Sequence, residues 1–131
     1  MIKKKKKYRS EIVNTVIGED THFTGSLNTQ KSVRIEGFFE GEIISQGEIF
    51  VGENSKVKAN LIAKNVVVAG EVIGNIEAIN GLEIYRSGRV VGDITGDHLY
   101  VEEGAIYKGR VNMDVISSKN DFEGPFKLIQ Q

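Results

Sequence analysis

A short phrase recurs along most of this 131-residue chain. Its clearest copy is VVVAGEVIGNI at residues 66–76, which reads apolar-x-apolar, a turn, then apolar-x-Gly-x-apolar. The same pattern occurs earlier, at residues 33–43, and later, at residues 82–94. Because self-similarity at a short spacing is typical of stacked repeat proteins, the repeat has to be explained before any single residue is given a chemical role.

Six copies of the phrase align in three apolar columns and one column of small residues. The first column is Ile17, Ile35, Val51, Val68, Ile84 and Val101; the second is Phe23, Phe39, Val57, Val72, Val90 and Tyr107; the third is Leu27, Ile43, Leu61, Ile76, Ile94 and Val111. The small residues, which lie between the second and third columns, are Gly25, Gly41, Ala59, Gly74, Gly92 and Gly109. Successive small residues are 16, 18, 15, 18 and 17 positions apart.

This pattern predicts an all-β fold. Alternation with period two within each run indicates strands, and 15 glycines spread along the chain disfavour helices. Short strands at a constant repeat suit coils stacked along one axis, so we predict a parallel β-solenoid of about six coils over residues 15–114. Six coils at ~4.8 Å each form a rod roughly 29 Å long.

The composition excludes several classes of protein. Hydrophobic residues make up 40% of the chain, which is enough for a packed core, and there is no cysteine for disulfides or thiolate metal sites. No apolar run approaches the ~20 residues that span a bilayer, and the basic start is not followed by the apolar segment of a signal peptide. We therefore expect a cytoplasmic protein.

The charges are unevenly distributed. Lys3 to Lys7 and Arg9 supply six of the 17 cations, and all 18 acids lie after them. The rest of the chain therefore has 11 cations against 18 acids, a net charge of −7. Because such a body repels phosphate backbones, we expect no nucleic-acid partner.

Residues 1–14 are predicted to form a basic, flexible tail. One interpretation is a solvated terminus, and the other is a contact with the inner face of the cell membrane. In the second, the contact residues are Met1, Ile2, Lys3, Lys4, Lys5, Lys6 and Lys7. Each basic residue near an anionic surface contributes about 1 kcal/mol, so many copies side by side would bind stably.

Residues 115–131 do not fit the columns, and the only proline, Pro125, lies among them. A proline cannot donate to a strand ladder, so the repeat is predicted to end near Asp114. The segment is then either a flexible tail or a partial cap, in which Phe122 and Phe126 fold back over the last coil.

No catalytic constellation is visible. His22 and His98 lie in turn regions beside acids, and acids such as Glu40 and Glu42 alternate with core positions and so face solvent. The glycines form no phosphate loop, because no Lys-Ser/Thr pair follows them. We expect no enzyme activity, no cofactor, no nucleotide and no metal.

The two terminal coils are the predicted functional surfaces. A solenoid normally carries caps, since an uncovered end coil is a template for another copy, and no amphipathic capping helix flanks this repeat. The predicted polymerisation residues are Ile17, Phe23 and Leu27 in the first coil and Val101, Tyr107 and Val111 in the last. In the alternative, the terminal segments cover both ends.

The chain resembles the bactofilins. The resemblance rests on NTVIGE at residues 14–19, VRIEGFFEGEI at 33–43, NVVVAGEVIGNIEA at 65–78 and GDI at 92–94. It implies a right-handed parallel β-helix that polymerises end to end into cytoskeletal filaments without nucleotide. It also implies an N-terminal tail that binds the inner membrane, and a scaffold role in cell shape or wall organisation with cell-wall or polar proteins as partners.

Two other classes stay open. Val51-Gly52 with later apolar residues is similar to the hexapeptide repeat of left-handed β-helix acyltransferases, which form trimers, although a strict six-residue period is absent. A monomeric solenoid adaptor would carry the same repeat and would form no filaments.

Overall fold

The computed structural model describes residues 13–118, and in that range the chain contains twelve strands. They are β1 (Val13–Ile17), β2 (His22–Thr29), β3 (Ser32–Ile35), β4 (Phe38–Ser45), β5 (Glu48–Val51), β6 (Lys56–Val68), β7 (Glu71–Ile73), β8 (Ile76–Ile84), β9 (Arg89–Val91), β10 (Ile94–Val101), β11 (Ile106–Lys108) and β12 (Val111–Ser118). None of these residues forms a helix long and apolar enough to cross a membrane.

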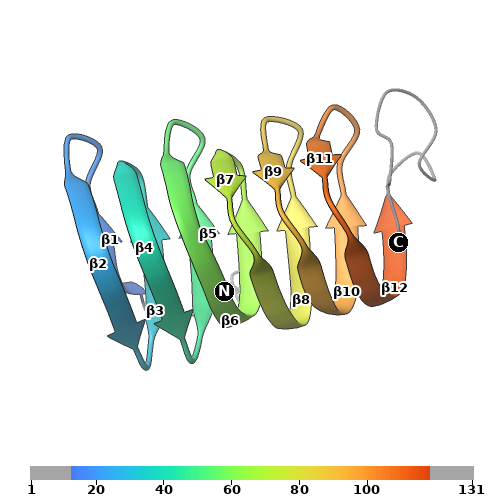
Figure 1. Cartoon of the computed structure of the whole chain (residues 1–131), viewed down its shortest axis with the longest axis horizontal. Helices are drawn as coiled ribbons and strands as arrows, with labels where there is room; N and C mark the ends of the chain where they lie inside the picture. Colours follow the sequence, from blue (N-terminus) through green and yellow to red (C-terminus); the bar gives the residue numbers. More distant parts are fainter. Residues whose placement is uncertain (1–12, 119–131) are drawn as a thin grey trace, which may run out of the picture.

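The strands wind into a parallel solenoid, as predicted. The opening stack contains β1, β3, β5 and the C-terminal parts of β6, β8, β10 and β12. The return stack contains β2, β4, the start of β6, and β7, β9 and β11 with the starts of β8, β10 and β12. In Figure 1 the return stack runs downward in front and the opening stack runs upward behind, while the coils advance from left to right; the winding is right-handed.

The apolar columns form the core. The register pairs Phe23 with Phe39 and Phe39 with Val57, so each residue lies directly on its counterpart in the next coil. Phe39, Ile43 and Val57 are fully buried. The alternation in each strand therefore places one side of every coil in a continuous apolar interior, which is the main stabilising term of the fold.

The small column permits the close approach of neighbouring coils. Gly41 has φ 134°, a backbone conformation that side chains rarely adopt, and a Cβ there would overlap the carbonyl oxygen of Gly25 in the preceding coil. Gly74 and Gly92 contact the preceding coil in the same way. Glycine is therefore required at these three positions by the close approach of the preceding coil, whereas the third coil has Ala59 in the same column.

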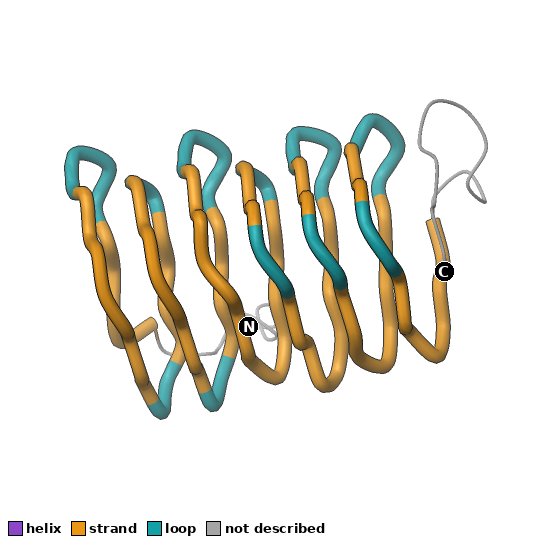
Figure 2. The backbone as a smooth tube through the Cα atoms, viewed as in Figure 1, coloured by secondary structure: helices purple, strands orange, loops and turns teal. Residues whose placement is uncertain are grey.

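A ladder of side chains that the sequence analysis did not identify links the later coils. In those coils the return strand is interrupted at the small residue and the residue after it, as the teal segments in front show (Figure 2). There the Oδ1 atom of Asn60 accepts from the backbone N–H of Asn75 at 3.0 Å, and Asn75 does the same for Asp93 at 3.0 Å. Asp93 in turn accepts from Arg110 at 3.1 Å, so the amides that leave the strand ladder stay satisfied.

Strand pairing continues past Asp114. Residues 115–118 of β12 pair with residues 98–101 of β10 and form a seventh strand of the opening stack. Similarly, β1 begins at Val13, inside the segment assigned to the basic tail. The predicted contacts of residues 1–7 and the predicted cap around Phe122 and Phe126 fall outside the described residues.

Candidate assembly surfaces at the two ends of the solenoid

The two ends of the rod differ from its middle in their backbone pairing. Among residues 13–118, interior strands such as β4 pair on both sides, whereas β1 and β2 pair only with β3 and β4. At the other end, β11 and β12 pair only with β9 and β10. The outer edges of these four strands carry N–H and C=O groups in the arrangement that a parallel strand would pair with.

The N-terminal end leaves part of the core uncovered. Phe23 stacks on Phe39 with ring centroids 4.8 Å apart and an interplanar angle of 8°, but it stays only partly buried. Leu27 is half-exposed in the same way, whereas Ile43, its neighbour in the next coil, is fully buried. The first coil therefore presents an aromatic and an aliphatic side chain along the rod axis.

Gly25 marks the same end. It has φ 141°, close to the 134° of Gly41, yet a Cβ on Gly25 would meet only Cε1 of Phe23, at 3.6 Å. The site that a neighbouring carbonyl fills in the interior coils is thus open in the first coil. An incoming coil could pack against this backbone as closely as Gly41 packs against Gly25.

At the C-terminal end the second-column side chain is buried, although Ile116 in β12 is only partly buried. Tyr107 is only 3% exposed, and its hydroxyl donates to the carbonyl oxygen of Gly92 at 2.8 Å and lies against the carbonyl oxygen of Arg110. Burial, reinforced by the nearby carboxylate of Asp93, raises the pKa of Tyr107 above its ordinary value. Tyr107 is thus a neutral, buried member of the last coil, and it presents little surface.

Val101 is not an end residue, contrary to the expectation from the columns. It is 1% exposed and pairs with Ile84 on one side and Ser118 on the other, because the chain adds one more strand to the opening stack. The outermost strand of this stack has Val115, 46% exposed, on its outer side beside His98. On its inner side is Ile116, which pairs with the buried Leu99 and is only partly buried. Sequence analysis missed Val115 because it was assigned to the tail.

Of the other predicted residues, Ile17 and Val111 do lie in the outermost strands but are buried by contacts inside the chain. At the N-terminal end, the most exposed apolar residue is Val16, at 59%. Exposed large apolar side chains of the described residues thus occur in the end strands, at Val13, Val16, Ile106 and Val115, but also in interior strands, at Ile73 and Ile79.

Both histidines lie on the surface. Nε2 of His22 is 3.4 Å from Oε1 of Glu40, and Nδ1 of His98 is 3.2 Å from Oδ2 of Asp97. Both imidazoles are more than half exposed. In the described part of the chain, no group of three His, Asp or Glu side chains is arranged to hold a metal ion.

Comparison with known proteins identifies the family. The family model described as "Bactofilin: Polymer-forming cytoskeletal" matches residues 15–112, nearly the whole solenoid. This chain belongs to the bactofilins.

Two relatives of this bactofilin are Bactofilin BacP and Bactofilin BacO of Myxococcus xanthus (strain DK1622). BacP is 38% identical over 104 residues, which are 79% of this chain and 43% of BacP. BacO is 35% identical over 104 residues, which are 79% of this chain and 82% of BacO. The bactofilin thus spans less than half the length of the first relative and most of the second.

A solved structure has the same fold as this bactofilin. It is a cryo-EM reconstruction of Thermus thermophilus bactofilin double helical filaments, with a TM-score of 0.73 and 29% sequence identity. The match covers 76% of this chain and 99% of the other. The two chains share the solenoid over nearly its whole length.

Proposed function

We propose that this bactofilin assembles end to end, without nucleotide, into filaments that serve as a membrane-associated scaffold in cell shape or wall organisation. The observation that carries the proposal is that both ends of residues 13–118 have strands paired on one side only, next to apolar core residues that are only partly buried. These residues are Phe23 and Leu27 at one end and Ile116 at the other. The filament form of the Thermus thermophilus relative supports it. Stacking on Phe23 and Leu27 would bury apolar surface and pair open strand edges in one step.

The decisive experiment images the purified protein by negative-stain microscopy without nucleotide. Wild type should form filaments, and Phe23→Arg should give small soluble species, because a charge would be buried unpaired at the junction. A penalty of several kcal/mol would raise the concentration needed for assembly by at least about 100-fold. Thr24→Arg is the matched control, since Thr24 is exposed in the same strand and points away from the Phe23 side.

The same sample distinguishes the other two classes. A wild-type protein that sediments as a monomer at micromolar concentration would contradict assembly and favour a monomeric adaptor. Discrete trimers in light scattering would favour the acyltransferase-like arrangement. Equal filament formation by Phe23→Arg and wild type would exclude Phe23 from the junction.

The proposed membrane contact runs through residues 1–7, and its support is the cluster of five lysines after Met1 and Ile2. Deletion of residues 1–9 should abolish co-sedimentation with anionic liposomes while filaments persist. Replacement of Lys3–Lys7 by glutamine keeps the length of the tail and should reduce binding similarly. Undiminished binding by the deleted protein would contradict the anchor. A cytoplasmic site of action and partners among wall or polar proteins belong to the same proposal.

A further inference from the structure

A groove crosses the outer face of the opening stack. It consists of two adjoining hollows of about 340 and 220 Å³, which share Glu48 and Val67 in their linings. The first hollow reaches Val13, at the start of β1, and the second reaches Tyr100 in β10. The groove therefore runs along the rod axis, across successive coils, and begins where the described chain begins.

The floor of the groove is apolar. The register places Arg34, Phe50, Val67 and Glu83 in successive coils on the outward side of the stack. Phe50 and Val67 line the groove together with Tyr85 and Tyr100. A surface of this kind, aromatic and aliphatic with a charged rim, suits an extended peptide segment with mixed apolar and charged side chains.

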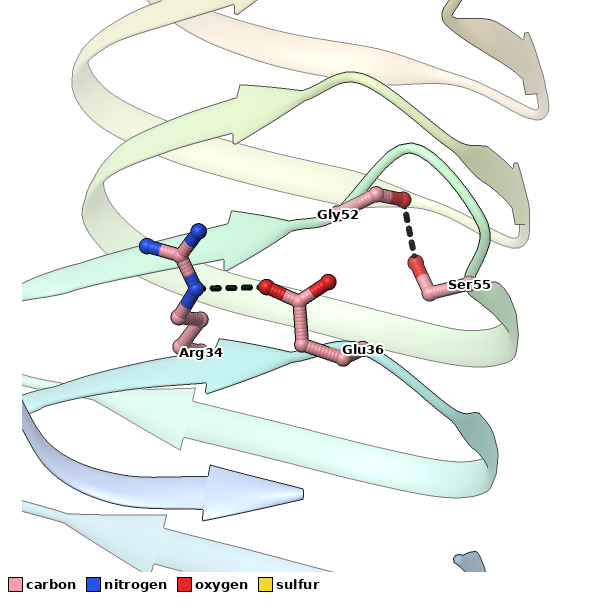
Figure 3. Close-up of polar contacts among 4 residues, drawn as sticks. All are labelled: Arg34, Glu36, Gly52 and Ser55. Atoms are coloured by element: carbon pink, nitrogen blue, oxygen red, sulfur yellow. Dashed lines mark hydrogen bonds and ion pairs between the residues drawn. The ribbon is translucent and has the colours of Figure 1, made fainter. Parts of the chain in front are cut away.

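The rim of the groove is acidic. Arg34 is the cation of the lining, but its Nε atom is 2.5 Å from Oε2 of Glu36 (Figure 3). Its guanidinium also lies 4.5 Å from the centroid of the Phe50 ring. Its charge is therefore largely compensated within the chain. The carboxylates of the lining are Glu48 and Glu83, and they give the groove a negative character that matches a basic occupant.

The N-terminal segment of the same chain has the charge and length that this groove requires. It contains Lys3 to Lys7, Tyr8 and Arg9, and it joins the groove at Val13. The five lysines are six to ten residues before Val13, a reach of up to about 20–33 Å at ~3.3 Å per residue. Glu48 is two strands from β1 in the opening stack and Glu83 is four, or roughly 10 and 19 Å at ~4.8 Å per strand.

We propose that residues 1–12 dock in this groove of their own subunit, with the lysines at Glu48 and Glu83 and Tyr8 over the apolar floor. A short tether holds the tail at an effective concentration in the millimolar range, so a weak, salt-sensitive contact suffices to occupy the groove. Docking and membrane contact use the same lysines and therefore exclude one another. This inference rests on the proposed membrane contact of the tail. It adds the groove as a second site, which competes with the membrane for the same lysines.

The test uses the full chain, a zero-length carbodiimide cross-linker and low salt. Cross-links from Lys3–Lys7 to Glu48 or Glu83 should exceed those to Glu53 and Glu103, two exposed turn residues, by about tenfold. Equal amounts of ¹⁴N- and ¹⁵N-labelled protein show whether each linked pair comes from one chain. Pairs of one isotope support docking within the subunit; mixed pairs would instead assign the groove to the tail of a second copy. Absence of enrichment would overturn the proposal.

Vesicle binding tests the competition. With phosphatidylserine-containing vesicles, the double variant Glu48→Gln/Glu83→Gln should bind several-fold more tightly than wild type, because its tail is no longer held. The matched control Glu53→Gln/Glu103→Gln removes two acids of equal charge away from the groove and should bind like wild type. Unchanged binding by the groove variant would overturn the competition. Filaments on microscopy grids and vesicle binding by wild type report separately on the proposed function, so either result can fail without the other.

Discussion

The two ends of this solenoid close in different ways. At the N-terminal end, Phe23 and Leu27 stay half-exposed and Gly25 faces open space. At the C-terminal end, Tyr107 and Val111 are buried, although no further coil covers them in the described chain. The difference shows that coils of the same repeat are not equivalent as surfaces. Side chains of the second and third columns are buried in the last coil and only partly buried in the first, while Ile116 leaves some apolar surface at the C-terminal end.

The largest expected difference between the two ends is the loss of stability when a second-column residue is replaced by arginine. Tyr107→Arg places a charge at a buried site and removes the phenol's hydrogen bonds, so the free energy of unfolding should fall by about 3–5 kcal/mol. Phe23→Arg should lower it by less than about 2 kcal/mol, because the ring is half-exposed and the arginine head can stay in water. Denaturant unfolding at concentrations too dilute for assembly measures both. Equal losses would mean that the two ends are packed alike.

Alanine in the small column sharpens the comparison. Gly25 and Gly109 have nearly the same φ, 141° and 142°, so each variant carries similar backbone strain, of about 1–3 kcal/mol. Only at Gly109 would the new Cβ also overlap a backbone atom, the carbonyl oxygen of Gly92. Gly109→Ala should therefore be less stable than Gly25→Ala by about 1–3 kcal/mol in thermal unfolding. A larger loss for Gly25→Ala would contradict the open first coil.

The hydroxyl of Tyr107 makes a smaller contribution to the free energy of unfolding, and this contribution depends on pH. Removing it in Tyr107→Phe should cost about 1 kcal/mol near neutral pH. Because burial raises the pKa of Tyr107, the unfolded chain ionises first, near pH 10, and the folded chain only at higher pH. The unfolded state then binds fewer protons than the native state, so wild-type stability falls as pH rises above about 10. In Tyr107→Phe the free energy of unfolding should fall less between pH 7 and a pH above 10 than it does in wild type, because the variant has no phenol at this position to ionise.

Val115 should have the smallest effect on the isolated subunit. It is nearly half exposed, so Val115→Asp should change the free energy of unfolding by no more than about 0.5 kcal/mol. If the C-terminal end stacks on another copy, the same variant should still reduce filament length in microscopy. A variant at an exposed turn position of an interior coil, Glu53→Asn, is the control and should leave filaments unchanged.

The periodicity was sufficient to predict the core. Phe39, Ile43 and Val57 were assigned to it from alternation and from their repetition coil after coil, and all three are fully buried. The buried positions can be predicted because each apolar column recurs in six coils. Alternation with period two also allows only one side of a strand to face inward. The right-handed winding came from the family resemblance, since spacing alone does not determine it.

Other features were missed by the sequence analysis. The strand at residues 115–118 continues an apolar column that the sequence analysis did not include, because Ile116 pairs with Leu99 and Leu99 pairs with Leu82. This extra strand makes Val101 an interior residue. The contacts from Asn60 to Asn75 and from Asn75 to Asp93 depend on where the return strand is interrupted.

The sequence by itself determined the solenoid, its apolar columns and its small column, because each follows from a local period repeated along the chain. Only the tertiary structure decided which end coil stays open, where Tyr107 places its hydroxyl, and that Glu48 and Glu83 share one groove with Val13. The physical reason is that the exposure of a side chain depends on the residues packed around it. Phe23 and Tyr107 occupy the same column, but their surroundings differ, so Phe23 is only partly buried and Tyr107 is buried.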